Sequence, residues 1–147
     1  METHTQSQQL VVFTIGGEQY ALPISGVQEI IRYSDPRSAA SADPSVRGIL
    51  SLRGRIVPVL DIAGRLGVSS ALSERSKIVI LEHETRALGV IVDDVDEVLT
   101  VEAEQLDEAP GADTTLIEAI AKLGDRLIVV LRAGTILGSV DPALAVA

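Results

Sequence analysis

The chain contains an internal repeat, and this repeat limits the folds that are open to it. Residues 10–31 align without a gap to residues 78–99, and residues 49–60 align in the same order to residues 120–131, with apolar residues opposite apolar residues. The closest agreement is between VQEII and VDEVL, the sequences that end the first aligned pair. Recurrence of a whole unit predicts two similar lobes rather than one long sheet.

Composition and local pattern predict that both lobes consist of β-strands. Among the 147 residues, 46% are hydrophobic but only 2% are aromatic, so the core must be built from Val, Ile, Leu and Ala. Branched side chains are stiff and pack well on a pleated surface. Short apolar segments separated by Gly, Pro and polar residues are typical of small barrels. The expected strands are 10–15, 19–23, 27–32, 48–52, 55–60, 77–82, 87–92, 95–101, 117–123 and 126–131.

Helices are expected only as short connections, so the predicted fold class is mainly all-β. Asp61 can cap a short helix that runs through Leu66 and stops at Gly67. A second helical segment is expected to close the chain at the C-terminus. The expected organisation is a disordered tail (1–9) and a single domain (10–147), which is made of two repeat units (10–67 and 77–132) and the closing segment (133–146).

Several classes of protein are disfavoured. The net charge of −9 argues against nucleic acid as a partner, because binding to its phosphates needs a basic patch. The chain has no Cys, which excludes disulfides and thiolate chemistry and suits a reducing compartment. No secretory signal precedes the first strand, and no apolar run approaches the roughly 18 residues of a membrane span. These features predict a cytoplasmic protein without direct membrane insertion.

The residues give little support to catalysis. His4 lies in the polar tail and His83 lies next to a hairpin turn, and neither has a nearby pattern typical of a nucleophile or an acid–base pair. No Gly-rich phosphate loop and no His pair with zinc-binding spacing occurs in the sequence. These patterns favour a binding module over an enzyme, with no cofactor expected.

An acidic run supplies the alternative in which the chain is an enzyme. Residues 93–108 contain eight carboxylates and no Lys or Arg. A small metal-dependent hydrolase would hold its cation with the cluster from Asp93 to Glu97. However, Asp94 and Asp96 lack the glycine and the distal glutamate of a calcium loop. Val and Leu alternate with the acids, as in a strand with one face in water, so a solvated face is favoured over a metal site.

Comparison of the two units separates shared from unshared positions. Arg55 and Arg126 occupy equivalent positions, as do Glu29 and Glu97, which favours structural roles for all four. A side chain that both lobes need in order to fold should recur in both units.

Arg53 differs between the units, because its counterpart is Gly124. Arg53 is expected at the tip of a hairpin, where Gly54 permits a tight two-residue turn. One interpretation is that Arg53 is a solvated loop residue. The other is that the rigid hairpin presents its planar guanidinium group, which binds a carboxylate or amide of a partner. Pro58 also differs, since Val129 is its counterpart. Proline cannot donate to a ladder, so its strand is expected at an edge or distorted.

Together these residues resemble the CheW family of chemotaxis coupling proteins. The likeness covers nearly the whole chain outside the first nine residues, and the motifs occur in the family's order. The matching segments are FTIG (13–16), YALPI (20–24), VQEII (27–31), GILSLRGRIVPVLD (48–61), GVIVDDV (89–95) and LGDRL (123–127).

The resemblance implies two SH3-like, five-stranded β-barrel lobes around a shared core. It also implies a non-enzymatic adaptor that joins the cytoplasmic tips of chemoreceptors to the regulatory domain of the histidine kinase CheA. Contacts with other CheW copies, in arrays recruited to the membrane, are part of the same expectation. The kinase contact would come from hairpins at the barrel edges, without assigned residues. The receptor-binding groove would involve Val27, Glu29, Ile30, Arg53, Gly89 and Val98.

Two residues depart from the family pattern. Ser51 stands where the family usually has Asn, and Arg132 stands where an acidic or amide residue is common. Arg132 reverses a charge near the end of the last expected strand. The sequence does not distinguish an adaptor for swimming chemotaxis from an adaptor in a chemosensory pathway that controls pili, surface growth or a second messenger.

Overall fold

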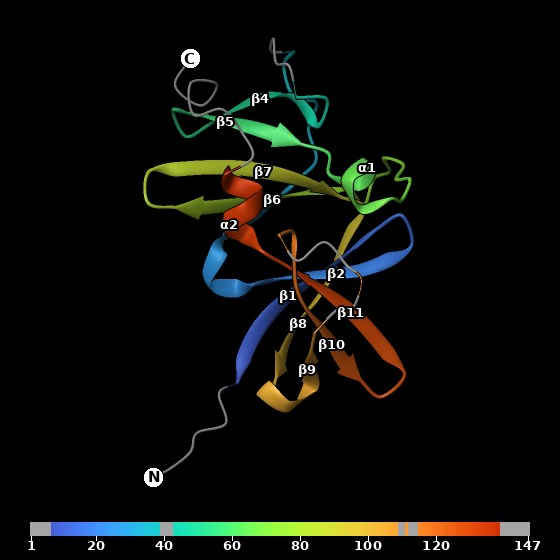
Figure 1. The fold of residues 1–147 in the computed structure, drawn as a ribbon. Coiled ribbons are helices and arrows are strands. Elements are labelled where there is room, and N and C mark those ends of the chain that lie inside the picture. Colours follow the sequence, from blue (N-terminus) through green and yellow to red (C-terminus); the bar gives the residue numbers. More distant parts are fainter. Residues whose placement is uncertain (1–6, 39–42, 109–110, 112–114, 139–147) are drawn as a thin grey trace.

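A computed structural model of the chain describes residues 7–38, 43–108, 111 and 115–138. Figure 1 shows two lobes, each built around a β-sheet. In chain order the elements are β1 (Gln8–Ile15), β2 (Glu18–Pro23), the 3-10 helix η1 (Ile24–Gly26), β3 (Val27–Arg32), β4 (Val46–Leu52), β5 (Arg55–Leu60), α1 (Ala63–Leu66), β6 (Lys77–His83), β7 (Arg86–Val92), β8 (Asp94–Val101), the 3-10 helix η2 (Ala103–Gln105), β9 (Leu106–Asp107), β10 (Ile117–Leu123), β11 (Arg126–Leu131) and α2 (Ala133–Gly138).

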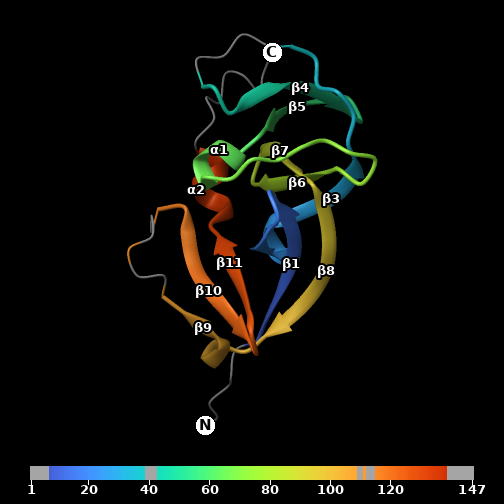
Figure 2. The ribbon, with the colours of Figure 1, turned by 90° about the vertical axis from the view of Figure 1, so that its right-hand side faces the viewer.

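Each sheet takes strands from both repeat units. The six-stranded sheet has the order β8-β1-β2-β11-β10-β9, and the five-stranded sheet has the order β3-β6-β7-β5-β4. The two orders become the same, apart from β9, when each strand is replaced by its repeat partner. The hairpins β1–β2 and β6–β7 are therefore exchanged, so that each completes the lobe formed by the other unit (Figures 1 and 2).

The mainly β fold with two lobes is confirmed, with corrections at three places. The short strand β9 pairs with β10 through Asp107 and Leu106, in a stretch expected to be a loop, so one sheet has six strands instead of five. The expected disordered tail of residues 1–9 is wrong for Gln8 and Gln9, which pair with β8 as part of β1. Backbone ladders form regardless of side-chain polarity, so polar residues can extend a strand without an apolar pattern.

The third correction concerns Pro58. It was expected at a sheet edge or a distortion, but β5 lies between β7 and β4. The parallel pairing of β5 with β7 begins at Val59, opposite Gly89, immediately after the proline. In the other sheet the equivalent pairing already includes Val129, opposite Tyr20. Because proline has no N–H to donate, the ladder starts one residue later where Pro58 stands.

Four β-bulges recur at equivalent places in the two sheets. The pairing of β3 with β6 skips Gln28, and the pairing of β8 with β1 skips Asp96 at the matching repeat position. The pairings of β4 with β5 and of β10 with β11 skip Arg47 and Glu118, which also match. A bulge bends its strand and increases the local twist. The repeated bulges explain how both sheets acquire the same barrel-like curvature.

The buried residues form three clusters, two inside the lobes and one between them. Strand alternation divides the exchanged hairpins between clusters, so that Leu10 and Val12 face the interior of one lobe while Phe13 and Ile15 face the shared core. The third cluster fills the five-stranded lobe and includes Ile78. The expected core shared by both lobes is therefore present.

The helices are short and cover the shared core. α1 begins two residues after Asp61, whose carboxylate accepts a hydrogen bond of 3.0 Å from the Ala63 N–H. It ends at Gly67, which has a left-handed φ of 76°. α2 buries Ile136 in the shared core. The remainder of the expected closing segment, beyond residue 138, lies outside the described residues. No helix among the described residues is long and apolar enough to cross a bilayer.

Exchange of the hairpins has a consequence for the linker between the units, residues 68–75. We insert a protease site between Ala71 and Leu72 and cleave the chain there. The two fragments should remain associated, because both sheets need strands from both fragments. Size-exclusion chromatography of the cut protein checks this: the fragments should elute together in buffer and separate only in denaturant. Independent elution in buffer would show that the units fold separately.

Candidate functional site

The tip of the β4–β5 hairpin is a tight two-residue turn. Arg53 and Gly54 have φ angles of 51° and 81°, and two consecutive positive values are typical of a type I′ turn. Glycine adopts this conformation without strain. The turn therefore presents Arg53, whose side chain is 64% exposed, at the end of a rigid hairpin.

An ion pair joins Arg53 to Glu29 on β3. β3 and β4 are the two edge strands of the five-stranded sheet, so this pair connects its open edges at one end of the lobe. The Glu29 side chain is half-buried and holds the guanidinium in place. The planar guanidinium retains further N–H donors beyond those that face Glu29, which a partner could use.

The residues next to Glu29 provide an apolar surface. Ile30 is 39% exposed, which is unusual for a large side chain within a strand. Val27 is half-buried and packs against the shared core. The structure therefore places Val27, Glu29 and Ile30 on one edge strand, with Arg53 in contact with that strand.

The remaining two predicted site residues lie elsewhere. Val98 is 51% exposed on β8, the edge strand of the other sheet, at the repeat position equivalent to Ile30. Gly89 is buried within β7 between Val59 and Ile80. A Cβ atom at Gly89 would lie 2.6 Å from the Cγ2 atom of Ile78, so the position requires glycine for close packing inside the lobe.

The arginines shared by both units form ion pairs within their own sheets. Arg126 donates to Glu97 at 2.7 Å and to Gln19 at 3.1 Å. Arg55 donates to Glu82 at 2.7 Å. The two equivalent arginines thus pair with residues at different repeat positions, yet each connects separate strands of its own sheet.

The acidic cluster on β8 is also structural. Asp93 accepts a hydrogen bond of 2.8 Å from the Gly16 N–H, and Asp94 lies 3.7 Å from Lys77. Asp96 accepts hydrogen bonds from Thr14 and Gln19 at 2.8 and 3.0 Å, so the carboxylates serve different neighbours. Among the described residues, no three His, Cys, Asp or Glu side chains are grouped to hold a metal ion. This geometry gives no support to the hydrolase alternative.

Two tyrosines have altered electrostatics. Burial raises the pKa of the Tyr20 hydroxyl, with a further contribution from Glu18. Burial also raises the pKa of Tyr33, assisted by its hydrogen bond to Asp35 at 3.0 Å. Both phenols therefore remain protonated at neutral pH, and Tyr33 serves as a hydrogen-bond donor.

Three large apolar residues that are exposed in the structure are not among the predicted site residues, namely Ile24, Leu72 and Leu127. Ile24 in η1 is 40% exposed, and Leu127 on β11 is 63% exposed. The polar sequence Ser25-Gly26 after Ile24 marks a turn, so an apolar residue there could have been flagged from the sequence. Leu127 lies in an apolar run, and only the structure shows that its side chain faces outward.

Known proteins resemble the chain over most of its length. The family model of the CheW-like domain matches residues 9–141. The chemotaxis protein CheW of Klebsiella aerogenes is 33% identical and aligns with 95% of this chain and 87% of the relative. Protein PilI of Pseudomonas aeruginosa is 30% identical over 61% of this chain and 51% of the relative.

A solved structure has the same fold. The crystal structure of the scaffolding protein TtCheW from Thermoanaerobacter tengcongensis superposes with a TM-score of 0.80 at 31% sequence identity, and the match covers 90% of this chain and 88% of that one. Agreement in sequence, in length and in fold points to a single family. The chain therefore belongs to the CheW-like domain family of non-enzymatic adaptors.

Proposed function

We propose that the chain couples the cytoplasmic tips of chemoreceptors to the regulatory domain of the histidine kinase CheA in a chemosensory array. The observation that carries the proposal is the edge strand β3, on which the exposed Ile30 follows directly after Glu29, the partner of Arg53. An apolar anchor beside an oriented arginine is typical of a specific protein interface. Membership of the CheW-like family supports the choice of partners.

The receptor would bind as a helical hairpin against the edge of the five-stranded lobe. Its apolar ridge would cover Ile30 and Val27, and Arg53 would set the register by donating to a carboxylate or amide on the helix. Val98 would extend the surface onto the second lobe. Gly89 would contribute indirectly, because its lack of a side chain allows close packing of the sheet beneath this surface.

The adaptor would transmit the state of the receptor without chemistry of its own. The kinase would bind a separate edge, so a change in the receptor could reach it through a rigid body. The shared core supports this view, because it holds residues of both lobes in one cluster. Contacts of modest area with a few anchors suit such reversible assembly.

Replacing Arg53 by alanine should weaken binding to receptor tips about tenfold or more, because a charged hydrogen bond at an interface is lost. The fold should remain intact, since exposed ion pairs contribute at most about 1 kcal/mol. Calorimetric titration of purified receptor tips into the wild type and R53A measures the change, and thermal unfolding monitors the fold.

The matched control is Arg55→Ala on the same hairpin. It also removes an ion pair, but that pair involves Glu82 instead of Glu29. Receptor affinity should be unchanged in R55A. Equal affinities of R53A and the wild type, with both folded, would remove Arg53 from the proposed receptor site.

A second circuit is favoured by one observation, the similarity to PilI. The same adaptor role would then operate in a chemosensory pathway that controls pili, surface growth or a second messenger. Deleting the gene and scoring swimming separately from surface motility distinguishes the circuits. Loss of surface motility alone would favour the second.

A further inference from the structure

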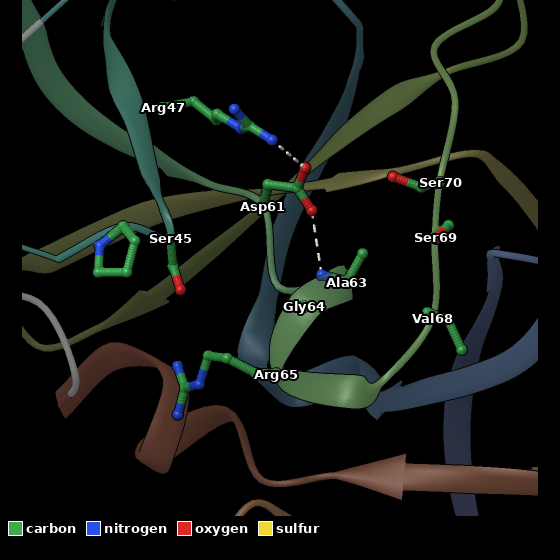
Figure 3. A pocket seen from close by; sticks show the side chains of 10 residues that line it. Ser45, Arg47, Asp61, Ala63, Gly64, Arg65, Val68, Ser69 and Ser70 are labelled. Atoms are coloured by element: carbon green, nitrogen blue, oxygen red, sulfur yellow. Dashed lines mark hydrogen bonds and ion pairs between the residues drawn. The ribbon is translucent and has the colours of Figure 1, made fainter.

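A polar pocket lies away from the proposed receptor surface, between α1, the start of β4 and the linker that joins the two units (Figure 3). It has a volume of about 420 Å³. Two arginines, Arg47 and Arg65, line it together with a single carboxylate, that of Asp61. Serine residues 45, 69 and 70 complete the polar lining. Among the described residues, the lining therefore contains two cationic side chains and one carboxylate, in a chain whose net charge is −9.

We propose that this pocket binds a phosphate group. A tetrahedral phosphate needs several hydrogen-bond donors from different directions, and arginine with serine supplies them. In Figure 3 the hydroxyl of Ser70 is turned toward Asp61, and that of Ser45 toward the side where Arg65 lies. Donors therefore surround the space from the linker, from β4 and from α1.

Hydrogen bonds fix Asp61 and the backbone on two sides of the pocket. Arg47 donates to one oxygen of Asp61 at 2.9 Å, while the other oxygen accepts the Ala63 N–H at 3.0 Å. The Ser45 carbonyl accepts a hydrogen bond of 2.8 Å from the Asp61 N–H. The Ser45 N–H in turn donates to Asp43 at 2.9 Å. A fixed backbone frame lowers the cost of ordering the side chains around an anion.

A neighbouring hollow provides room for the organic part of a phosphate ester. It has a volume of about 400 Å³ and shares Arg47, Asp61 and Ser70 with the first pocket. Tyr33 and Leu72 also line it, so it can receive an aromatic or aliphatic group. The ligand class is therefore phosphate itself or a small phosphate monoester.

Asp61 makes the proposal sharply testable. Its carboxylate repels an anion and competes for Arg47, so phosphate must bind despite it. The substitution Asp61→Asn would keep a side-chain oxygen for the Ala63 N–H while removing the charge. We expect D61N to bind phosphate more tightly than the wild type, and R65Q to bind it about tenfold more weakly. Opposite effects of two substitutions in one pocket are not expected of non-specific anion binding.

The experiment is an NMR titration of the full chain that follows the backbone amides of Ser45, Gly64 and Ser70. Inorganic phosphate and phenyl phosphate are added separately. The control variant is R75Q, which removes an arginine that does not line the pocket. Saturable shifts with both ligands at equal affinity assign the site to free phosphate. Tighter binding of phenyl phosphate assigns it to esters.

The proposal is overturned if neither ligand gives saturable shifts at these amides. It is also overturned if R65Q and R75Q weaken binding equally, because the effect would then reflect net charge alone. The amide spectrum of each variant reports its fold in the same experiment, and R65Q changes an exposed side chain that α1 does not bury.

Discussion

Replacing Phe13 by alanine should lower the free energy of unfolding by about 3–5 kcal/mol, which is the usual loss for a buried phenylalanine. Phe13 is completely buried in the shared core and stacks on Tyr20 with the ring centroids 6.4 Å apart. It is the only phenylalanine in the chain, and the core otherwise consists almost entirely of aliphatic side chains. Apart from Tyr20, the neighbours of Phe13 in this cluster are aliphatic, so F13A would leave a cavity in a densely packed core.

The position of Phe13 predicts the form of the transition as well as its size. Because the shared core joins the exchanged hairpins, both lobes should unfold together at a lower temperature, by roughly 10 °C. Calorimetry together with urea unfolding measures this. The matched control is Leu127→Ala, which removes an apolar side chain that is 63% exposed and should cost little. Two separate transitions in F13A would contradict a core that the lobes share.

Replacing Gly89 by alanine should destabilise the protein by about 1–3 kcal/mol, the range for overpacking a filled core. The added methyl group would lie 2.6 Å from Ile78 Cγ2, and Ile78 is fully buried. A branched methyl group close to its own backbone cannot turn away as the end of a flexible side chain would. Urea unfolding of G89A gives the magnitude.

Gly134→Ala is the control for Gly89→Ala. Gly134 lies in α2, and a Cβ atom there meets no atom within 4 Å. Alanine is favoured over glycine in a helix, so G134A should be neutral or stabilising by up to about 1 kcal/mol. If G89A is as stable as the wild type, the close packing at Gly89 is not required for the fold.

Much of the local structure could be predicted from the sequence. The aligned repeats placed equivalent strands correctly, and Gly54 marked the tight turn at Arg53 because consecutive positive φ angles favour glycine. Recurrence in both units also marked Arg55 and Arg126, which form ion pairs within their own sheets. These predictions depend on periodicity and turn chemistry, which act over a few residues.

The arrangement of strands could not be predicted in the same way. A continuous apolar run indicates that a strand such as β2 is buried on both faces, but it does not show that β2 lies parallel to β11, from the far end of the chain. The exchange of hairpins depends on these distant pairings. Sequence repetition alone is equally compatible with two lobes that each keep their own hairpin.

The candidate site was predictable in part. Glu29 and Arg53 come from opposite edges of one sheet, and no local signal in the sequence indicates that they pair. The burial of Gly89 also depends on the neighbouring strands. The Arg47–Asp61 pocket was missed because its residues come from a β-strand, a helix entry and a linker, which only the fold brings together.

The most direct test of the adaptor proposal is to mix the protein with receptor tips and with the regulatory domain of CheA, first separately and then together. Analytical ultracentrifugation of the three mixtures measures the masses of the complexes. The proposal predicts binary binding to each partner and a ternary complex that contains all three components. Competition between the partners for this protein, or failure to bind either, would contradict a coupler with two separate surfaces.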